Sequence, residues 1–168
     1  MADPLQQLQR LHEEIDRLAE EIASRHPGRL QCRLGCASCC VDELTVFEIE
    51  AAAIRQRYGD ELAKLTPRAP GSCALLAPDD SCLIYEVRPY VCRTQGLPLR
   101  WVDAGAEGAI EYRDICPLNL PGPALEDLPA EACWTIGPFE TRLRNLQITF
   151  GGPGCERIAL RDLFSRGK

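Results

Sequence analysis

Cysteine crowding is the feature that most constrains this chain. Four cysteines fall within nine residues, at positions 32, 36, 39 and 40, and four more follow by position 116. Packing as a small hydrophobic group is a common explanation for one buried thiol, but not for four so close together. We therefore expect these cysteines to bind metal as thiolates, with disulfides formed by oxidation after purification as the alternative.

The N-terminal residues and the net charge indicate the surroundings of these thiols. The first 25 residues carry acidic side chains and no apolar block like the core of a signal peptide, and no run of about eighteen apolar residues occurs. We expect a soluble, cytoplasmic protein without membrane contact, in which thiols stay reduced and available to metals. The net charge of -6 argues against nucleic acid as a partner.

The spacing of the cysteines predicts two metal sites. The candidate ligands are Cys32, Cys36, Cys39, Cys40, Cys73, Cys82, Cys92 and Cys116. Tight turns between closely spaced cysteines direct several sulfurs at one metal, and Gly35 supplies backbone freedom for such a turn. Because neighbouring side chains diverge, Cys39 and Cys40 are expected to serve different metals or one multinuclear cluster. Eight thiolates at four per tetrahedral site favour two sites, closed by the later cysteines.

The pattern along the chain predicts a small, cysteine-rich α+β domain around a metal-thiolate centre. We divide residues 1–168 into an N-terminal amphipathic helix (1–27), a cysteine-cluster core (32–116) and a helical C-terminal part (117–168). A capping box at residues 45–48 predicts a second helix that ends at Gly59. Short β-hairpins are expected around residues 78–81 and 105–108, a helix at 139–150, and a short helix at 156–164.

Two stretches carry a resemblance to a known family. The segments C-A-S-C-C at 36–40 and C-L-I-Y-E-V-R-P-Y-V-C-R at 82–93 resemble the CxxCxxCC cysteine-cluster family. Zinc or iron chelation has been ascribed to that family, and flagellin N-methylase-like proteins are grouped with it. The resemblance covers residues 32–116 and implies that Cys36, Cys39, Cys40, Cys73, Cys82 and Cys92 are ligands, joined by Cys116. Three residues separate Cys32 from Cys36, where the family pattern has two.

Residues outside this pattern receive other interpretations. Cys133, beside Trp134, is expected to be a packed thiol, and Cys155 is interpreted as an exposed thiol rather than a ninth ligand. His12 and His26 flank the first helix, where a solvated or capping role is the ordinary explanation. A role in shaping the chain is favoured over direct chemistry for Tyr85, Glu86, Arg88 and Pro89.

The sequence thus indicates a metal-binding protein with a structural or metal-handling role. Zinc is favoured over iron because it survives aerobic handling, and iron or an iron–sulfur cluster remains the alternative cofactor. A redox or protein-modifying enzyme built on such a cluster is the second hypothesis, which the resemblance to methylase-like proteins implies. The sequence contains no phosphate-binding loop, HExxH motif or nucleophile elbow that would indicate another activity. The third is an interaction module, in which the helix at 1–27 mediates self-association or binds a protein partner.

Overall fold

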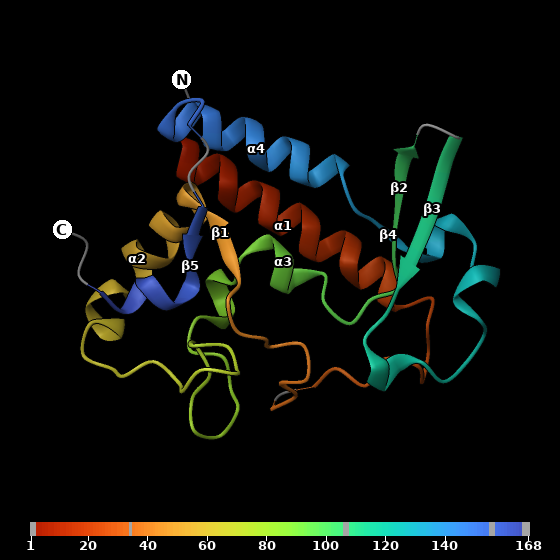
Figure 1. Ribbon diagram of the computed structural model, residues 1–168, viewed down its shortest axis with the longest axis horizontal. Coiled ribbons are helices and arrows are strands. Elements are labelled where there is room, and N and C mark those ends of the chain that lie inside the picture. Colours follow the sequence, from red (N-terminus) through yellow and green to blue (C-terminus); the bar gives the residue numbers. More distant parts are fainter. Residues whose placement is uncertain (1–2, 34, 106–107, 155–156, 166–168) are drawn as a thin grey trace.

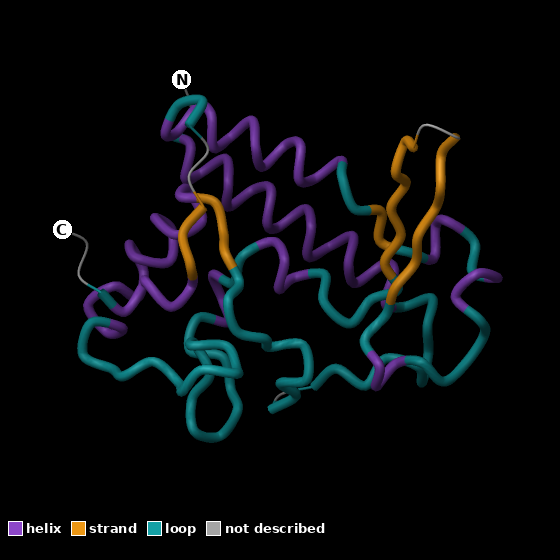
Figure 2. Tube along the Cα trace, viewed as in Figure 1, coloured by secondary structure: helices purple, strands orange, loops and turns teal. Residues whose placement is uncertain are grey.

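Helices α1 (Pro4–Ala23) and α4 (Pro138–Gly151) lie side by side along the upper edge of the molecule, and loops fill its lower edge (Figures 1 and 2). This computed structural model describes residues 3–33, 35–105, 108–154 and 157–165. Within those ranges, the chain is a small mixed α+β domain with four helices and two small sheets. The predicted fold class is therefore confirmed.

The first helix begins as its sequence predicts, but it ends at Ala23, before the predicted end at residue 27, because the chain turns from Ser24 onward. The Asp3 carboxylate accepts a hydrogen bond from the Leu5 amide at 3.2 Å, and Pro4 occupies the first turn, where its missing N–H costs nothing. Leu8, Leu11 and Ile15 form a buried stripe that packs in one hydrophobic cluster with residues of α4 and of the short strand β4 (Trp134–Thr135). The apolar stripe is thus already covered by the chain's own core.

The second helix differs from its prediction at both ends. Thr45–Phe47 is a strand, β1, and helix α2 spans Glu48–Leu62. The carboxylate that closes its first turn belongs to Glu50, whose Oε2 accepts from the Phe47 amide at 3.3 Å. The capping box at 45–48 was therefore wrong, because β1 pairs with the C-terminal strand β5 (Arg157–Ala159) and keeps Thr45 extended. Gly59 does not end the helix, because the turn after it continues to the buried Leu62.

The chain turns back on itself at both predicted β-hairpins, but only the one around residues 105–108 consists of two strands. Strands β2 (Leu99–Gly105) and β3 (Gly108–Asp114) make an antiparallel hairpin, and β4 joins β2 in parallel. In the loop before α3 (Tyr90–Arg93), a single antiparallel bridge joins Leu76 to Cys82. The short helix expected at 156–164 is instead strand β5 followed by a 3-10 turn at Leu160–Phe164.

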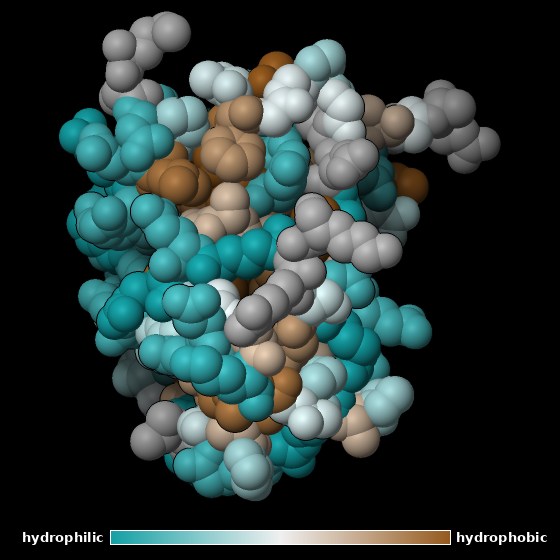
Figure 3. Space-filling model, turned by 90° about the vertical axis from the view of Figure 1, so that its left-hand side faces the viewer, coloured by the Kyte–Doolittle hydropathy of each residue, from teal (hydrophilic) through white to brown (hydrophobic). Residues whose placement is uncertain are grey.

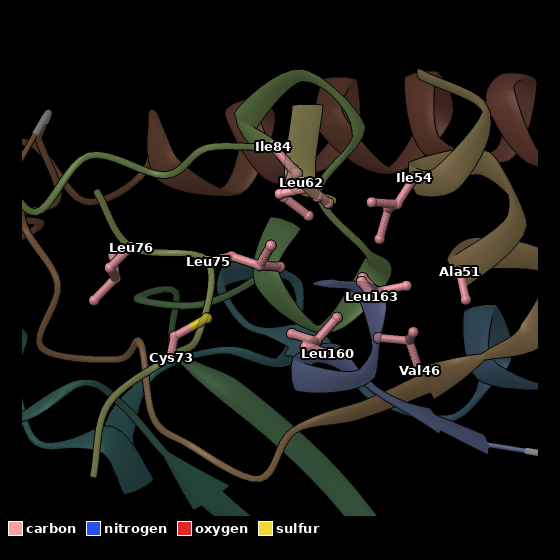
Figure 4. Close-up of a cluster of buried hydrophobic side chains, with 10 residues drawn as sticks. All are labelled: Val46, Ala51, Ile54, Leu62, Cys73, Leu75, Leu76, Ile84, Leu160 and Leu163. Carbon is pink, nitrogen blue, oxygen red and sulfur yellow. The ribbon is translucent and has the colours of Figure 1, made fainter. Parts of the chain in front are cut away.

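The interior contains two hydrophobic clusters. One packs α1 against α4, and the other packs α2 against the 3-10 turn at Leu160–Phe164 and the loop that carries Cys73 (Figure 4). The side of the molecule shown in Figure 3 is largely hydrophilic, with small hydrophobic patches between polar residues. In the described part of the chain, no helix is both long and apolar enough to span a membrane.

Candidate metal centre

The candidate ligands come from four segments. Cys32–Cys40 is a loop before β1, Cys73 and Cys82 lie on the loop between α2 and α3, Cys92 lies in α3, and Cys116 follows β3. The loops that carry them lie toward the lower edge of Figure 1. All nine described cysteines are free thiols, and Cys155 lies outside the described residues. Reduced thiols are the form that metal binding requires.

Asn119 joins the segments of Cys32 and Cys116. Its side chain is fully buried, and its amide nitrogen lies 3.6 Å from the Cys32 sulfur and donates to the Gly96 carbonyl at 2.8 Å. Its carbonyl oxygen accepts from the Gln31 amide at 2.7 Å, and its backbone amide donates to the Cys116 carbonyl at 2.8 Å. One side chain therefore fixes three loops that are far apart in the sequence.

Gly96 provides the space beside the Cys32 sulfur. A β-carbon at this position would lie 2.3 Å from that sulfur, and the backbone φ of +89° is one that glycine adopts most readily. Cys36 lies on an adjacent turn, where its amide donates to the Arg33 carbonyl at 2.9 Å and Gly35 has a φ of +80°. The turn predicted from Gly35 is therefore present.

A second group of cysteines lies against the hydrophobic interior. The Cys73 amide donates to the Cys40 carbonyl at 2.9 Å, and Cys73 is only 9% exposed. In Figure 4 its sulfur lies beside Leu75 and Leu160, and Cys40 and Cys82 pack against the same cluster. These three thiols thus share an apolar environment.

Helix α3 holds Cys92 through buried polar contacts. Glu50 is 4% exposed, and its Oε1 accepts from the Tyr90 amide at 2.7 Å. Arg93 pairs with Asp16 of α1 at 2.5 Å and donates to the Glu86 carbonyl at 3.3 Å. Residues around Cys92 in the cysteine motif therefore anchor α3 to α1 and α2, in agreement with a role in shaping the chain.

The thiols influence one another's pKa in two neighbourhoods. Burial raises the pKa of Cys32, and the charges of Cys36, Cys39 and Cys116 raise it further. Burial likewise raises the pKa of Cys92 to about 12, with further contributions from Cys73, Cys82 and Cys39. The Cys40 thiol interacts with Cys39, Cys73 and Cys92. Cys39 therefore affects the pKa of Cys32 in one neighbourhood and the pKa of Cys92 in the other.

The adjacent Cys39 and Cys40 side chains influence each other's ionisation. Their interaction lowers the pKa of Cys39 and raises that of Cys40, so Cys39 loses its proton more readily.

The cysteine thiols are ligands of a type that binds zinc or iron, but they are not arranged around a metal position. Within the described ranges, no group of three or more Cys, His, Asp or Glu side chains is arranged to hold a metal ion. The eight candidate thiols are free, and thiolates are the ligand type that zinc and iron–sulfur sites use. Binding would have to draw the loops together, so it would be coupled to local folding.

Comparison with known families agrees with this donor set. Residues 31–116 match the model of the CxxCxxCC family, described as a proposed zinc- or iron-chelating domain. The chain belongs to this family. All eight candidate ligands of this CxxCxxCC protein lie within the matched residues. Neither a curated protein nor a solved structure was found to match the chain significantly.

Two histidines are more buried than the sequence predicts, whereas Cys133 is packed as expected. His12 and His26 are buried rather than solvated: His12 lies 3.6 Å from Glu50, and His26 bonds the Ala132 carbonyl at 2.7 Å. The Cys133 thiol is 4% exposed, as expected for a packed thiol, and lies 3.9 Å from a guanidinium nitrogen of Arg113. These three side chains are thus held by core contacts.

Sequence reasoning missed Asn119 and Glu50, which are buried polar side chains that hold cysteine segments. Asn119 follows Cys116 by three residues, but its contact with Cys32 spans 87 positions. Glu50 follows Phe47 in the first turn of α2, yet its contact with Tyr90 spans 40 positions. Such distant partners leave no local signal in one sequence.

Proposed function

We propose that this CxxCxxCC protein binds two zinc ions, each held by four cysteine thiolates. The outer thiols are Cys32, Cys36, Cys39 and Cys116, and the inner thiols are Cys40, Cys73, Cys82 and Cys92. The observation that supports this division most strongly is that Asn119 joins the segments of Cys32 and Cys116, whereas Cys73 belongs to a hydrophobic cluster against which Cys40 and Cys82 pack. Placing Cys39 in one site and Cys40 in the other gives each site four thiolates.

The expected role of both ions is to link distant loops. The inner thiols join the loop before β1, the loop after α2 and helix α3, and the outer thiols join the first of these to the segment after β3. Metal ions would therefore supply cross-links that the open cysteine geometry lacks, and part of the free energy of folding would come from binding.

Nearby cations support the inner site electrostatically. A zinc ion with four thiolates carries a formal charge of -2, which favours basic groups nearby. Arg161 favours the charged form of Cys73, and Arg88 favours that of Cys82, although burial raises the pKa of both thiols. Arg113, by contrast, binds Glu111 and the carbonyls of Leu125 and Leu128.

Zinc is favoured over iron because it is retained in air and has no redox chemistry of its own. A reducing compartment such as the cytoplasm would keep the ligands as thiols. The first experiment is elemental analysis with a visible spectrum, on protein purified without oxygen from cells supplied with both metals. About two zinc per chain and no visible colour are expected. Iron with inorganic sulfide and absorption near about 400 nm would instead identify an iron–sulfur protein.

Single substitutions test the ligand assignment. Cys39→Ser and Cys40→Ser should each lower the zinc content and the stability of the zinc-treated protein, because each removes a thiolate from one site. Cys133→Ser is the matched control, because its buried thiol lies beside Arg113. Equal zinc content in all three variants would contradict the assignment.

A further inference from the structure

A cavity lies where the loop after α1 meets the segment that follows the β2–β3 hairpin (Figure 1). Its volume is about 410 Å³, within the range of about 300–1,000 Å³ that is typical of small-molecule sites. Arg25, His26 and Arg29 line it, together with three prolines, Leu128 and Ala132. None of the described residues in its wall is acidic. The cavity therefore combines basic groups with apolar walls.

Arg29 is a buried cation without an anionic partner. Its side chain belongs to a residue that is only 8% exposed, and it forms no ion pair with an acidic side chain in the described ranges. Its Nε donates to the Asn119 carbonyl at 2.9 Å, and Nη2 donates to the Leu120 carbonyl at 3.4 Å. The remaining nitrogen, Nη1, is buried and has no hydrogen-bond partner among the described residues. Because a buried charge is costly unless an opposite charge compensates it, an anion in the adjacent cavity would stabilise this guanidinium.

The surrounding chain holds the Arg29 guanidinium in a fixed orientation. A β-carbon on Gly122 would lie 3.5–3.7 Å from Cδ, Nε and Cζ of Arg29, so the backbone of Gly122 packs closely against this side chain. The φ of Gly122 is +124°, a value that glycine adopts most readily. Together with the two carbonyl contacts, this packing orients the guanidinium before any ligand arrives. A group that is already oriented loses little conformational entropy on binding.

The two other basic residues connect and border the cavity. The Nε2 atom of His26 donates to the Ala132 carbonyl at 2.7 Å, because a carbonyl oxygen can only accept, and this bond joins the two segments that enclose the cavity. Arg25 is exposed and forms no ion pair within the part of the chain that the structure describes. Its positive charge therefore adds to that of Arg29 in attracting an anion.

We propose that this cavity binds a small molecule that carries a carboxylate on an apolar group, such as an aromatic carboxylic acid. The carboxylate lies on the side of Arg29, because a planar guanidinium matches the two oxygens of a carboxylate. The apolar group lies against Leu128 and the prolines, where its burial removes apolar surface from water. Inorganic phosphate has no group to fill these walls. None of the described residues that line the cavity is a cysteine, so this proposal does not rest on the proposed function.

Titration with three probes tests the proposal. Two-dimensional NMR of the isotope-labelled intact chain follows the backbone amides within residues 25–29 and 128–132 during additions of benzoate, its neutral analogue benzamide, or inorganic phosphate. Benzoate is expected to shift these signals saturably and to bind at least about tenfold more tightly than benzamide, because hydrogen bonds between charged groups are stronger than those between neutral ones. Equal affinity for benzoate and benzamide, equal affinity for benzoate and phosphate, or no saturable shift would each overturn the proposal.

Matched substitutions test the role of the positive charges. Arg29→Gln should weaken benzoate binding by at least about tenfold, because it removes the buried charge. Arg25→Gln, at an exposed position, should weaken it by about two- to fivefold, the range of an exposed ion pair. Arg144→Gln is the control, because this exposed arginine of α4 lies outside the cavity and its substitution makes the same change in net charge.

The control variant should bind benzoate as the wild-type protein does. Full affinity in Arg29→Gln, or equal weakening in Arg25→Gln and Arg144→Gln, would overturn the proposal. If Arg29→Gln does not fold, the comparison of the two exposed arginines decides the outcome.

Discussion

Substituting Gly96 tests whether the Cys32 sulfur must occupy its place beside Asn119 for metal to bind. In Gly96→Ala, the new β-carbon would lie 2.3 Å from that sulfur. Non-bonded carbon–carbon contacts are most favourable at about 3.5–4.0 Å, and a carbon–sulfur contact is at least as long, so the sulfur would move by more than about 1 Å. The sulfur would therefore no longer lie in its place beside Asn119, and Cys32 is expected to bind zinc less well in this variant.

Gly28→Ala separates this clash from the backbone cost. Gly28 has a φ of +75°, and a β-carbon there would meet no atom within 4 Å, whereas Gly96 has a φ of +89°. An alanine in this region of φ costs about 1–2 kcal/mol in either position. Because the exposed Cys32 side chain can turn away, both variants should lose about that much free energy of unfolding when metal is absent.

The assay combines urea denaturation of the metal-free variants with the zinc content of the zinc-treated ones. Gly28→Ala should keep two zinc ions, and Gly96→Ala should keep one. Two tightly bound zinc ions in Gly96→Ala would refute the placement of Cys32 in the outer site.

Other parts of the account predict further outcomes. Asn119→Ala should lower the free energy of unfolding by about 2–4 kcal/mol in urea denaturation, because buried partners lose their hydrogen bonds; the exposed Asn145→Ala, measured alongside, should change it little. Glu50→Ala should cost a similar amount of about 2–4 kcal/mol, because the Tyr90 and Phe47 amides lose their acceptor; Glu61→Ala, on the exposed face of α2, is the control, and equal losses would contradict the role of Glu50. Burial raises the pKa of Cys92 from 9.0 to about 12. The unfolded chain therefore releases this proton first, and the stability of the metal-free protein should fall between about pH 9 and 12. Denaturation at a series of pH values should show a shallower fall in Cys92→Ala, and an identical fall would contradict the burial of this thiol.

Local signals predicted the parts of the fold that depend on neighbours in sequence. The Asp3–Pro4 start of α1, its apolar stripe, and the β2–β3 hairpin with its paired glycines follow from short-range patterns. The start of α2 was misplaced because Thr45 pairs with Ala159, a partner 114 residues away. Helix-capping rules use only residues that are close in sequence, so they cannot predict that contact.

The candidate site, like the fold, could be predicted only in part from the sequence. Cysteine spacing indicated the family and metal binding in general, and its assignment of individual ligands stays a prediction. It could not predict that Asn119 binds the segments of Cys32 and Cys116, or that Cys73 lies in the core while Cys32 is exposed. These differences depend on how the loops fold back on α1 and α2, and they are the basis for separating the two sites.

The most direct test of two zinc–thiolate sites is zinc K-edge X-ray absorption of the protein purified without oxygen. About four sulfur neighbours per zinc at about 2.3 Å, with no lighter ligand, are predicted. Nitrogen or oxygen neighbours at about 2.0–2.1 Å would contradict the assignment of eight cysteines to two four-thiolate sites.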